Sequence, residues 1–251
     1  MSVGSGFLAD LRTVLRGRDF RRLFAVRLTG QFGDGVLQVA LASYVFFSPE
    51  RQTSAAAAAG AFAVLLLPYS IVGPFAGVLL DRWRRRQVLL WANVVRTVLV
   101  LALAGQVLAG QAGPVFYASV LVTLSVNRFI LAGLSASLPH VVPQHELVMA
   151  NAVSPTSGTV AAMLGGLTGF GLARALGGTG GQVDVIVASA LIYLAAGLLA
   201  LRIDRDLLGP DLEGGIPDPW GAVHHVAAGM VGGARHVWEC RPAARALAAI
   251  G

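Results

Sequence analysis

The sequence contains no lysine, a single cysteine and few charged residues of either sign. All 19 basic residues are arginine, and only 13% of the 251 residues are charged, about half the share of an average soluble domain. Hydrophobic residues make up 55% of the chain, which excludes a disordered protein and leaves too few polar groups to cover a water-exposed globule. The lone Cys240 excludes a disulfide framework and a cysteine-based zinc site. A polytopic membrane protein is the class that remains.

Enzyme signatures are lacking as well. Without lysine there is no phosphate-binding loop of the Gly-x-x-x-x-Gly-Lys-Ser/Thr type, and no Ser/His/Asp arrangement stands in a recognisable context. His224 and His225 are adjacent and point to different faces of a helix, while His140 and His145 lack a third ligand. We therefore expect no enzyme, no metal site and no cofactor. The net charge of +6 reflects membrane topology, so we expect no nucleic-acid partner.

Long charge-free runs predict the membrane spans. Residues 52–80, 97–127 and 147–173 carry no charge, and a spanning helix needs about 20 apolar residues. We therefore predict an all-α polytopic membrane protein with six transmembrane helices. The predicted helices, separated by glycine and proline turns, are 22–47, 55–80, 88–109, 115–138, 152–174 and 183–202. Residues 203–241 form a polar central loop, and residues 242–251 begin a seventh span.

The positions of the arginines predict the orientation. With the N-terminus inside, fifteen arginines fall in cytoplasmic segments and only Arg51 and Arg174 fall outside. We expect a multi-pass protein of the cell inner (cytoplasmic) membrane. Its cytoplasmic segments are 1–21, 81–87, 139–151 and 203–241. Within the amphipathic N-terminus, residues 7–15 have the spacing of a basic helix that either lies on the anionic inner leaflet or, as we favour, anchors the first span.

The first span carries a polar stripe. Its members are Arg27, Gln31, Asp34 and Gln38, whose spacings of three and four residues place them on one helical face. A charge near mid-bilayer costs about 2.5–3.5 kcal/mol on insertion scales and is tolerated beside a wet cavity or a partner. Asp34 is therefore a carboxylate that titrates or contacts substrate along the transport path, or one half of a structural ion pair with Arg128 or Arg96.

Two further features lie within the other spans. Arg128 stands in span four, and Arg96 stands in span three one turn from Asn93, close enough to the inner surface to favour snorkelling. Gly165 and Gly169 are four residues apart, a spacing that indicates close contact with another helix.

The loop after the second span resembles the signature of a known family. It reads Gly77-Val-Leu-Leu-Asp81-Arg82-Trp-Arg84-Arg85-Arg86 and is similar to the loop Gly-x-Leu-x-Asp-Arg-x-Gly-Arg-Arg/Lys that the major facilitator superfamily carries at this place in its topology. Arg84 replaces the second glycine of the family. A plain positive-inside loop explains the arginines, but not a carboxylate at the membrane edge preceded by Gly77.

Other segments resemble the bacterial exporters of this superfamily. The segments are Phe20-Arg21-Arg22-Leu23-Phe24 with Gly30-Gln31-Phe32-Gly33-Asp34-Gly35, then Leu138-Pro139-His140-Val141-Val142-Pro143 with Ala150-Asn151-Ala152. Gly165-Gly166-Leu-Thr-Gly169-Phe170 stands at the place of the family's fifth-span motif Gly-Pro-x-x-Gly-Gly. Arg128 with Gly133 is like the span-four motif, with one residue more between them. The resemblance implies a fold of twelve spans in two halves, of which this chain supplies the first.

The resemblance implies a secondary active transporter that works by alternating access. We expect a proton-coupled small-molecule exporter, here as a truncated or N-terminal half. Its expected partners are the lipid bilayer, the small molecule, the proton and a missing C-terminal half or partner bundle. The candidate coupling residues are Asp34, Gln31, Gln38 and Arg128, and the candidate conformational-switch loop comprises Gly77, Asp81, Arg82, Arg85 and Arg86. The alternative is a half-size membrane scaffold or subunit that assembles with itself or a partner and does not transport alone.

Overall fold

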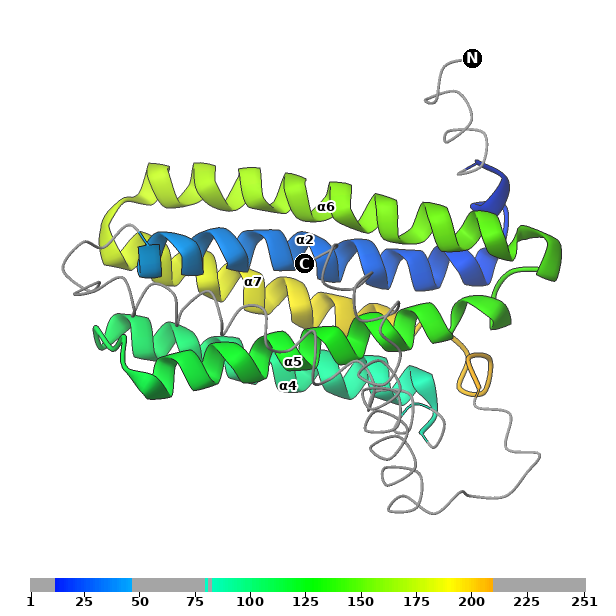
Figure 1. Cartoon of the computed structure of the whole chain (residues 1–251), viewed down its shortest axis with the longest axis horizontal. Coiled ribbons are helices and arrows are strands. Elements are labelled where there is room, and N and C mark those ends of the chain that lie inside the picture. Colours follow the sequence, from blue (N-terminus) through cyan, green and yellow to red (C-terminus); the bar gives the residue numbers. More distant parts are fainter. Residues whose placement is uncertain (1–11, 47–79, 81–82, 210–251) are drawn as a thin grey trace, which may run out of the picture.

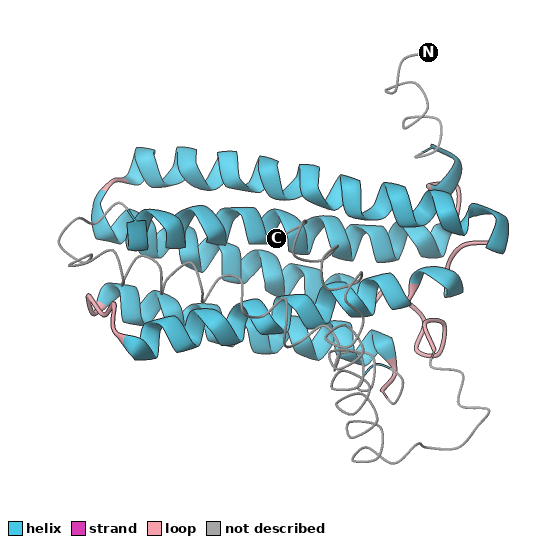
Figure 2. Cartoon of the chain, in the orientation of Figure 1, coloured by secondary structure: helices cyan, strands magenta, loops and turns pink. Residues whose placement is uncertain are grey.

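The computed structural model describes residues 12–46, 80 and 83–209 of the chain. These residues form helices joined by turns, as Figure 2 shows. The five long helices are α2 (Arg18–Phe46), α4 (Arg85–Leu108), α5 (Pro114–Ala136), α6 (Leu147–Leu176) and α7 (Gly178–Ala200). Two short 3-10 helices, η2 (Leu138–His140) and η3 (Gln144–Glu146), connect α5 to α6.

The predicted class of an all-α membrane protein is confirmed. Four helical stretches within the described residues are long and apolar enough to cross a membrane: Arg85–Leu108, Pro114–His140, Gln144–Leu176 and Gly178–Ala200. The predicted spans 88–109, 115–138, 152–174 and 183–202 fall within or close to them. The predicted span 55–80, except for Leu80, and the start of a seventh span at 242–251 lie outside the described residues.

The helix at the predicted first span differs from the other four. α2 begins at Arg18 rather than at residue 22, and is not among the helices apolar enough to cross a membrane by composition alone. The physical reason is the predicted polar stripe, which puts Arg27 and Asp34 in the middle of the helix. Both of these side chains are buried in the bundle rather than exposed to lipid.

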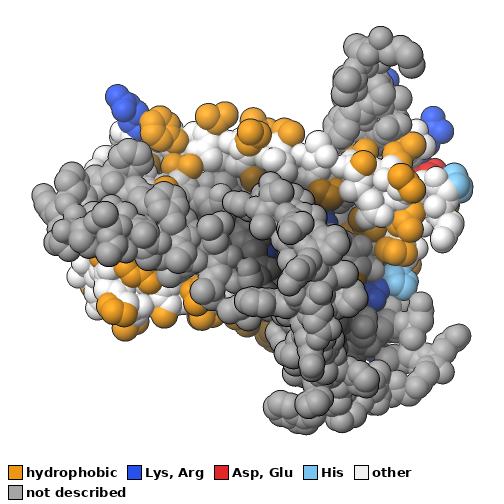
Figure 3. Space-filling model, in the orientation of Figure 1, with side chains coloured by type: hydrophobic (Ala, Val, Ile, Leu, Met, Phe, Trp, Pro, Cys, Tyr) orange, Lys and Arg blue, Asp and Glu red, His pale blue; other side chains and the backbone are white. Residues whose placement is uncertain are grey.

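α2 lies in the middle of the bundle. It packs between α6 and α7, α7 packs in turn on α4, and α4 packs on α5 (Figure 1). The outer face of α6 is apolar and exposed, as the upper edge of Figure 3 shows. The large apolar side chains of α6 that are at least half exposed are Val148, Val160, Met163, Leu164, Leu167, Phe170 and Leu176. Such a face suits contact with lipid.

Glycines allow α2 and α6 to approach at backbone distance. A Cβ atom on Gly35 would overlap the carbonyl oxygen of Ala162, and one on Gly165 would overlap the carbonyl oxygen of Phe32. A Cβ on Gly169 would come within 3.0 Å of the Cα of Val36. The packing role predicted for Gly165 and Gly169 is therefore confirmed, in the manner of small-residue contacts between membrane helices.

The ends of the helices that the arginine pattern assigns to one side do lie together. Arg22 at the start of α2 is 3.8 Å from Asp204 after α7, and Arg84 before α4 is 3.3 Å from Asp206. The N-terminal segment also joins this end: Val14 is only 1% exposed and packs in the same apolar cluster as Phe20. Val14 therefore contacts the bundle, while residues 7–11 of the predicted basic helix lie outside the described residues, and the role of that helix stays a prediction.

Candidate functional site

Most of the buried apolar side chains belong to two large clusters, with a polar layer between them. In α4 the first cluster contains Leu89 and the second contains Val100, and the buried residues between them include Asn93 and Arg96. The same order recurs in α2 and α5. The members of the layer are Arg27, Asp34, Asn93, Arg96, Thr97, Thr123, Asn127 and Ser189. Burial of polar groups is unfavourable unless they are paired, so their concentration at one depth marks a candidate site.

Asp34 has partners on two other helices. Its carboxylate forms an ion pair with Arg96 of α4, and the two side chains are only 5% and 2% exposed. The hydroxyl of Tyr193 on α7 donates a hydrogen bond to Oδ1 at 3.1 Å, and Nε2 of Gln31 donates one to Oδ2 at 3.1 Å. Both carboxylate oxygens are thus satisfied, and the negative charge is balanced inside the bundle.

Arg96 is also held by an aromatic face. Its guanidinium carbon lies 3.6 Å from the centroid of the Tyr193 ring, a cation–π contact. The prediction that Arg96 snorkels to the inner surface is wrong, because the side chain turns into the bundle toward Asp34 and its residue is 1% exposed. Of the two arginines considered as partners of Asp34, the structure pairs Arg96, whereas Arg128 lies partly buried on α5.

Hydrogen bonds hold α4 in register around Arg96. The hydroxyl of Thr97 donates to the carbonyl oxygen of Asn93 at 2.9 Å and to that of Ala190 on α7 at 3.3 Å. The side-chain amide of Asn93 donates to the carbonyl oxygen of Leu89 at 2.7 Å. The second of these Thr97 bonds ties α4 to α7 one turn from Tyr193, so the face that carries Arg96 is fixed against the ring.

The remaining members of the predicted stripe lie in different surroundings. Arg27 is buried, and its Nη2 donates to the hydroxyl of Ser135 on α5 at 3.0 Å. Gln31 is partly buried and bonded to Asp34, but Gln38, one turn beyond Asp34, is exposed. The stripe therefore runs from the interior of the bundle to its surface, and Asp34 stands at the last position where it is enclosed.

The predicted switch loop is described in part. Arg85 donates from Nη1 to the carbonyl oxygens of Ala136 (3.1 Å) and Leu208 (3.0 Å). The same nitrogen is 2.7 Å from Nε2 of His140. Since a guanidinium only donates, this His140 nitrogen is the acceptor. Arg85 thus joins the end of α5, η2 and the segment after α7.

Arg86 makes a second connection of the same kind. Its Nε and Nη2 lie 3.4 and 3.1 Å from the carbonyl oxygens of Ala200 and Leu201, at the C-terminal end of α7. A cation at this end of a helix satisfies unpaired carbonyls and complements the helix dipole. The other members of the loop, Gly77, Asp81 and Arg82, lie outside the described residues, and their roles stay predictions.

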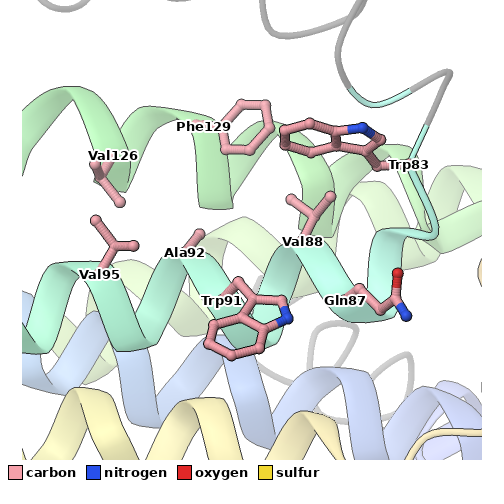
Figure 4. A pocket seen from close by; sticks show the side chains of 8 residues that line it. All are labelled: Trp83, Gln87, Val88, Trp91, Ala92, Val95, Val126 and Phe129. Carbon is pink, nitrogen blue, oxygen red and sulfur yellow. The ribbon is translucent and has the colours of Figure 1, made fainter.

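An apolar groove of about 490 Å³ runs along α4 and α5 (Figure 4). Its lining residues are Trp83, Gln87, Val88, Trp91, Ala92, Val95, Val126 and Phe129. Leu80 packs beside it, on Val88 and Phe129. The described residues of the lining include no ionisable group, so they offer none of the proton or ion chemistry that the polar layer offers. Within the part of the chain that is described, no three His, Cys, Asp or Glu side chains are grouped to hold a metal.

The sequence indicates one of the two partners that Asp34 has on other helices, and not the other. Arg96 is one of the two arginines that the sequence offers as an ion-pair partner of Asp34, although its position favours snorkelling. Tyr193 lies in an otherwise apolar stretch, and nothing in its local sequence indicates a partner on α2 or α4.

No family model matches the chain. Its curated relatives include an MFS-type transporter of Mycobacterium bovis and an MFS-type transporter of Mycobacterium tuberculosis. Each is 43% identical over 247 residues, which cover 95% of this chain and 54% of the relative. The chain therefore spans about half the length of the curated relatives it matches. With this identity along nearly all of its length, the chain is similar to about half of an MFS-type transporter.

Proposed function

We propose that this chain is the N-terminal bundle of a proton-coupled secondary transporter that exports a small molecule by alternating access. The observation that carries the proposal is the buried pair of Asp34 and Arg96. While Asp34 is ionised, the pair is neutral. Protonation of Asp34 leaves the Arg96 charge uncompensated in the interior, and an unpaired buried charge costs about 3–5 kcal/mol.

This cost links proton binding to conformation. Asp34 lies on α2, Arg96 on α4 and Tyr193 on α7. The ion pair and its hydrogen bond to Tyr193 therefore connect three helices of the bundle. An arrangement that admits water to the layer solvates Arg96 and is favoured when Asp34 is protonated, whereas the closed arrangement is favoured when Asp34 is ionised. A ligand shifts such an equilibrium only if it binds one arrangement more tightly than the other. The proton does so here, because Asp34 binds it more tightly in the arrangement that admits water than in the closed one.

The proposal is tested with full-length protein reconstituted in vesicles that contain a pH-sensitive dye. A panel of candidate small molecules is added under an imposed pH gradient, and substrate-dependent proton movement is recorded. A transporter of the proposed kind gives proton flux with at least one compound, and this flux disappears in Asp34→Asn. Substrate flux that persists without proton movement contradicts proton coupling. Self-assembly of the chain without any flux supports the half-size scaffold instead.

We further propose that the N-terminus and the arginine-rich end are cytoplasmic, in the inner membrane. In a Cys240→Ala background, a cysteine at exposed Arg205 is expected to react with an impermeant thiol reagent only after the cells are opened. A cysteine at exposed Gln111, in the turn at the opposite end of α4, is the matched control and is expected to react in intact cells. The reverse labelling pattern would contradict the orientation.

The switch loop is proposed to act through Arg85. Arg85→Gln removes the charged donor to two carbonyl oxygens and to His140, and hydrogen bonds to charged groups contribute about 1.5–3 kcal/mol each. The midpoint of thermal unfolding (Tm) of the purified protein is expected to fall by roughly 5 °C, with slower transport. Arg205→Gln, an exposed arginine at the same end, is the control and should leave both unchanged. An unaltered Tm in Arg85→Gln would show that these contacts do not hold the helix ends.

A further inference from the structure

The structure assigns to Tyr193 a positioning role: we propose that its ring holds Arg96 in place whenever Asp34 is neutral. The inference rests on the proposed function for its physiological meaning, because Asp34 is neutral only when it carries a proton. The contact itself is a property of the fold. Tyr193 is fully buried, and it is the residue of α7 that contacts both members of the pair.

The hydroxyl and the ring of Tyr193 contact different partners. The hydroxyl donates to the Asp34 carboxylate at 3.1 Å, a bond that favours the charged form of the acid. The ring lies 3.6 Å below the Arg96 guanidinium, and this attraction contributes most when Asp34 is neutral, because the guanidinium then has no counter-ion. A cation over a desolvated ring keeps a favourable partner after its counter-ion is lost.

A glycine of α2, Gly33, leaves room for the Tyr193 ring beside Asp34. A Cβ atom on Gly33 would stand 2.6 Å from Cε1 of Tyr193, so any larger residue next to Asp34 would displace the ring. Gly30, one turn earlier on α2, has nothing within 4 Å of such an atom. The glycine at position 33 therefore places Tyr193 under both Asp34 and Arg96.

The other charged groups at this depth come from two helices. Arg27 on α2 is bonded to Ser135, and Arg128 is partly buried on α5. Among the described residues, α7 contributes the neutral Ser189 and Tyr193 to the layer, and α6 faces Arg27 and Gln31 with Gly158. Both additional charges are positive, so neither can replace Asp34 as a counter-ion. Among the described residues, the Tyr193 ring is the group that remains against Arg96 when Asp34 is neutral.

The test is a set of thermal-unfolding measurements on purified full-length protein, which need neither a substrate nor a proton gradient. Asp34→Asn imitates the protonated acid. Tyr193→Leu removes the ring face and keeps an apolar side chain. We expect Tyr193→Leu to lower Tm by roughly 4 °C more in the Asp34→Asn background than in the wild type. This excess should vanish when Arg96→Gln is added, because no buried cation is then left for the ring to hold.

Three comparisons make the result decisive. Tyr193→Phe keeps the ring and should show no excess loss in the Asp34→Asn background. Tyr44→Phe removes another buried tyrosine hydroxyl, one that donates to the carbonyl oxygen of Gln111 at 2.8 Å outside the polar layer, and should be additive with Asp34→Asn. In transport assays Tyr193→Phe should shift the pH profile, whereas Tyr44→Phe should not.

The outcomes separate the inference from the proposed function. Additive losses for Tyr193→Leu and Asp34→Asn, or an excess that persists after Arg96→Gln, would overturn the positioning role whatever the protein transports. The losses of Tm in Tyr193→Leu and Asp34→Asn could be non-additive while transport does not respond to the pH gradient. That result would retain the positioning role and overturn proton coupling.

Discussion

Asp34→Asn is expected to abolish proton-driven transport by the full-length protein and to lower its Tm. The asparagine keeps the size and polarity of the side chain but cannot titrate, and it leaves the charge of Arg96 uncompensated, at a cost of about 3–5 kcal/mol. Substrate binding should survive if Asp34 does not contact the substrate. The measurements are gradient-driven flux in vesicles and thermal unfolding of the same preparation. Asp34→Glu should retain partial activity with a shifted pH optimum.

Two further variants separate titration from architecture. Asp184→Asn makes the same chemical change at an exposed position at the start of α7, and should alter neither flux nor Tm. Asp34→Asn combined with Arg96→Gln removes both charges and should recover most of the lost Tm but not proton coupling. Recovery of gradient-driven flux in the double variant would show that Asp34 serves only the ion pair. Normal flux in Asp34→Asn alone would remove it from the coupling mechanism.

Gly165→Ala and Gly35→Ala are expected to destroy the packing of α2 on α6. In each case the new methyl group would overlap a backbone carbonyl oxygen of the facing helix, and a backbone atom cannot rotate away as a side chain can. The helices must separate, which also disturbs Asp34 one residue from Gly35. We expect little folded protein after extraction, or a Tm lowered by roughly 10 °C, measured by size-exclusion chromatography and thermal unfolding.

The chain supplies a matched control for this change. Gly171 lies on α6 and Gly105 on α4, and a Cβ atom built on either meets nothing within 4 Å. Gly171→Ala and Gly105→Ala should be neutral or stabilising by up to about 1 kcal/mol, since alanine is the better helix former. If all four variants behaved alike, the close approach of α2 and α6 would not be what holds the bundle together.

The helices themselves could be predicted because their signal is local. Charge-free runs located α4, α5, α6 and α7 to within a few residues, and the glycine spacing at 165 and 169 indicated a tight contact without naming the partner helix. The polar residues of α2 were visible for the same reason, since a carboxylate in a long apolar segment stands out in any single sequence.

The site could not be completed in the same way, because its pairing is set by how the helices pack. Arg96 and Arg128 are equally plausible partners for Asp34 in the sequence, and only the packing of α2, α7 and α4 brings one of them into contact. Tyr193 carries no local signal, since a tyrosine among apolar residues is ordinary core. Gln38 has the right spacing, but the bundle leaves it exposed.

The position of α2 in the bundle has a consequence for how the protein is made. Among the described helices α2 is translated before the others, with Arg27 and Asp34 within it, whereas its two flanking helices α6 and α7 follow α4 and α5. The hydroxyl that bonds Asp34 follows 159 positions later in the chain. Arg96, which balances the Asp34 charge, arrives earlier with α4, and Tyr193 on α7 supplies the last of the described partners of Asp34. Among the described helices, the buried polar residues of α2 are therefore fully enclosed only after α7 has been translated.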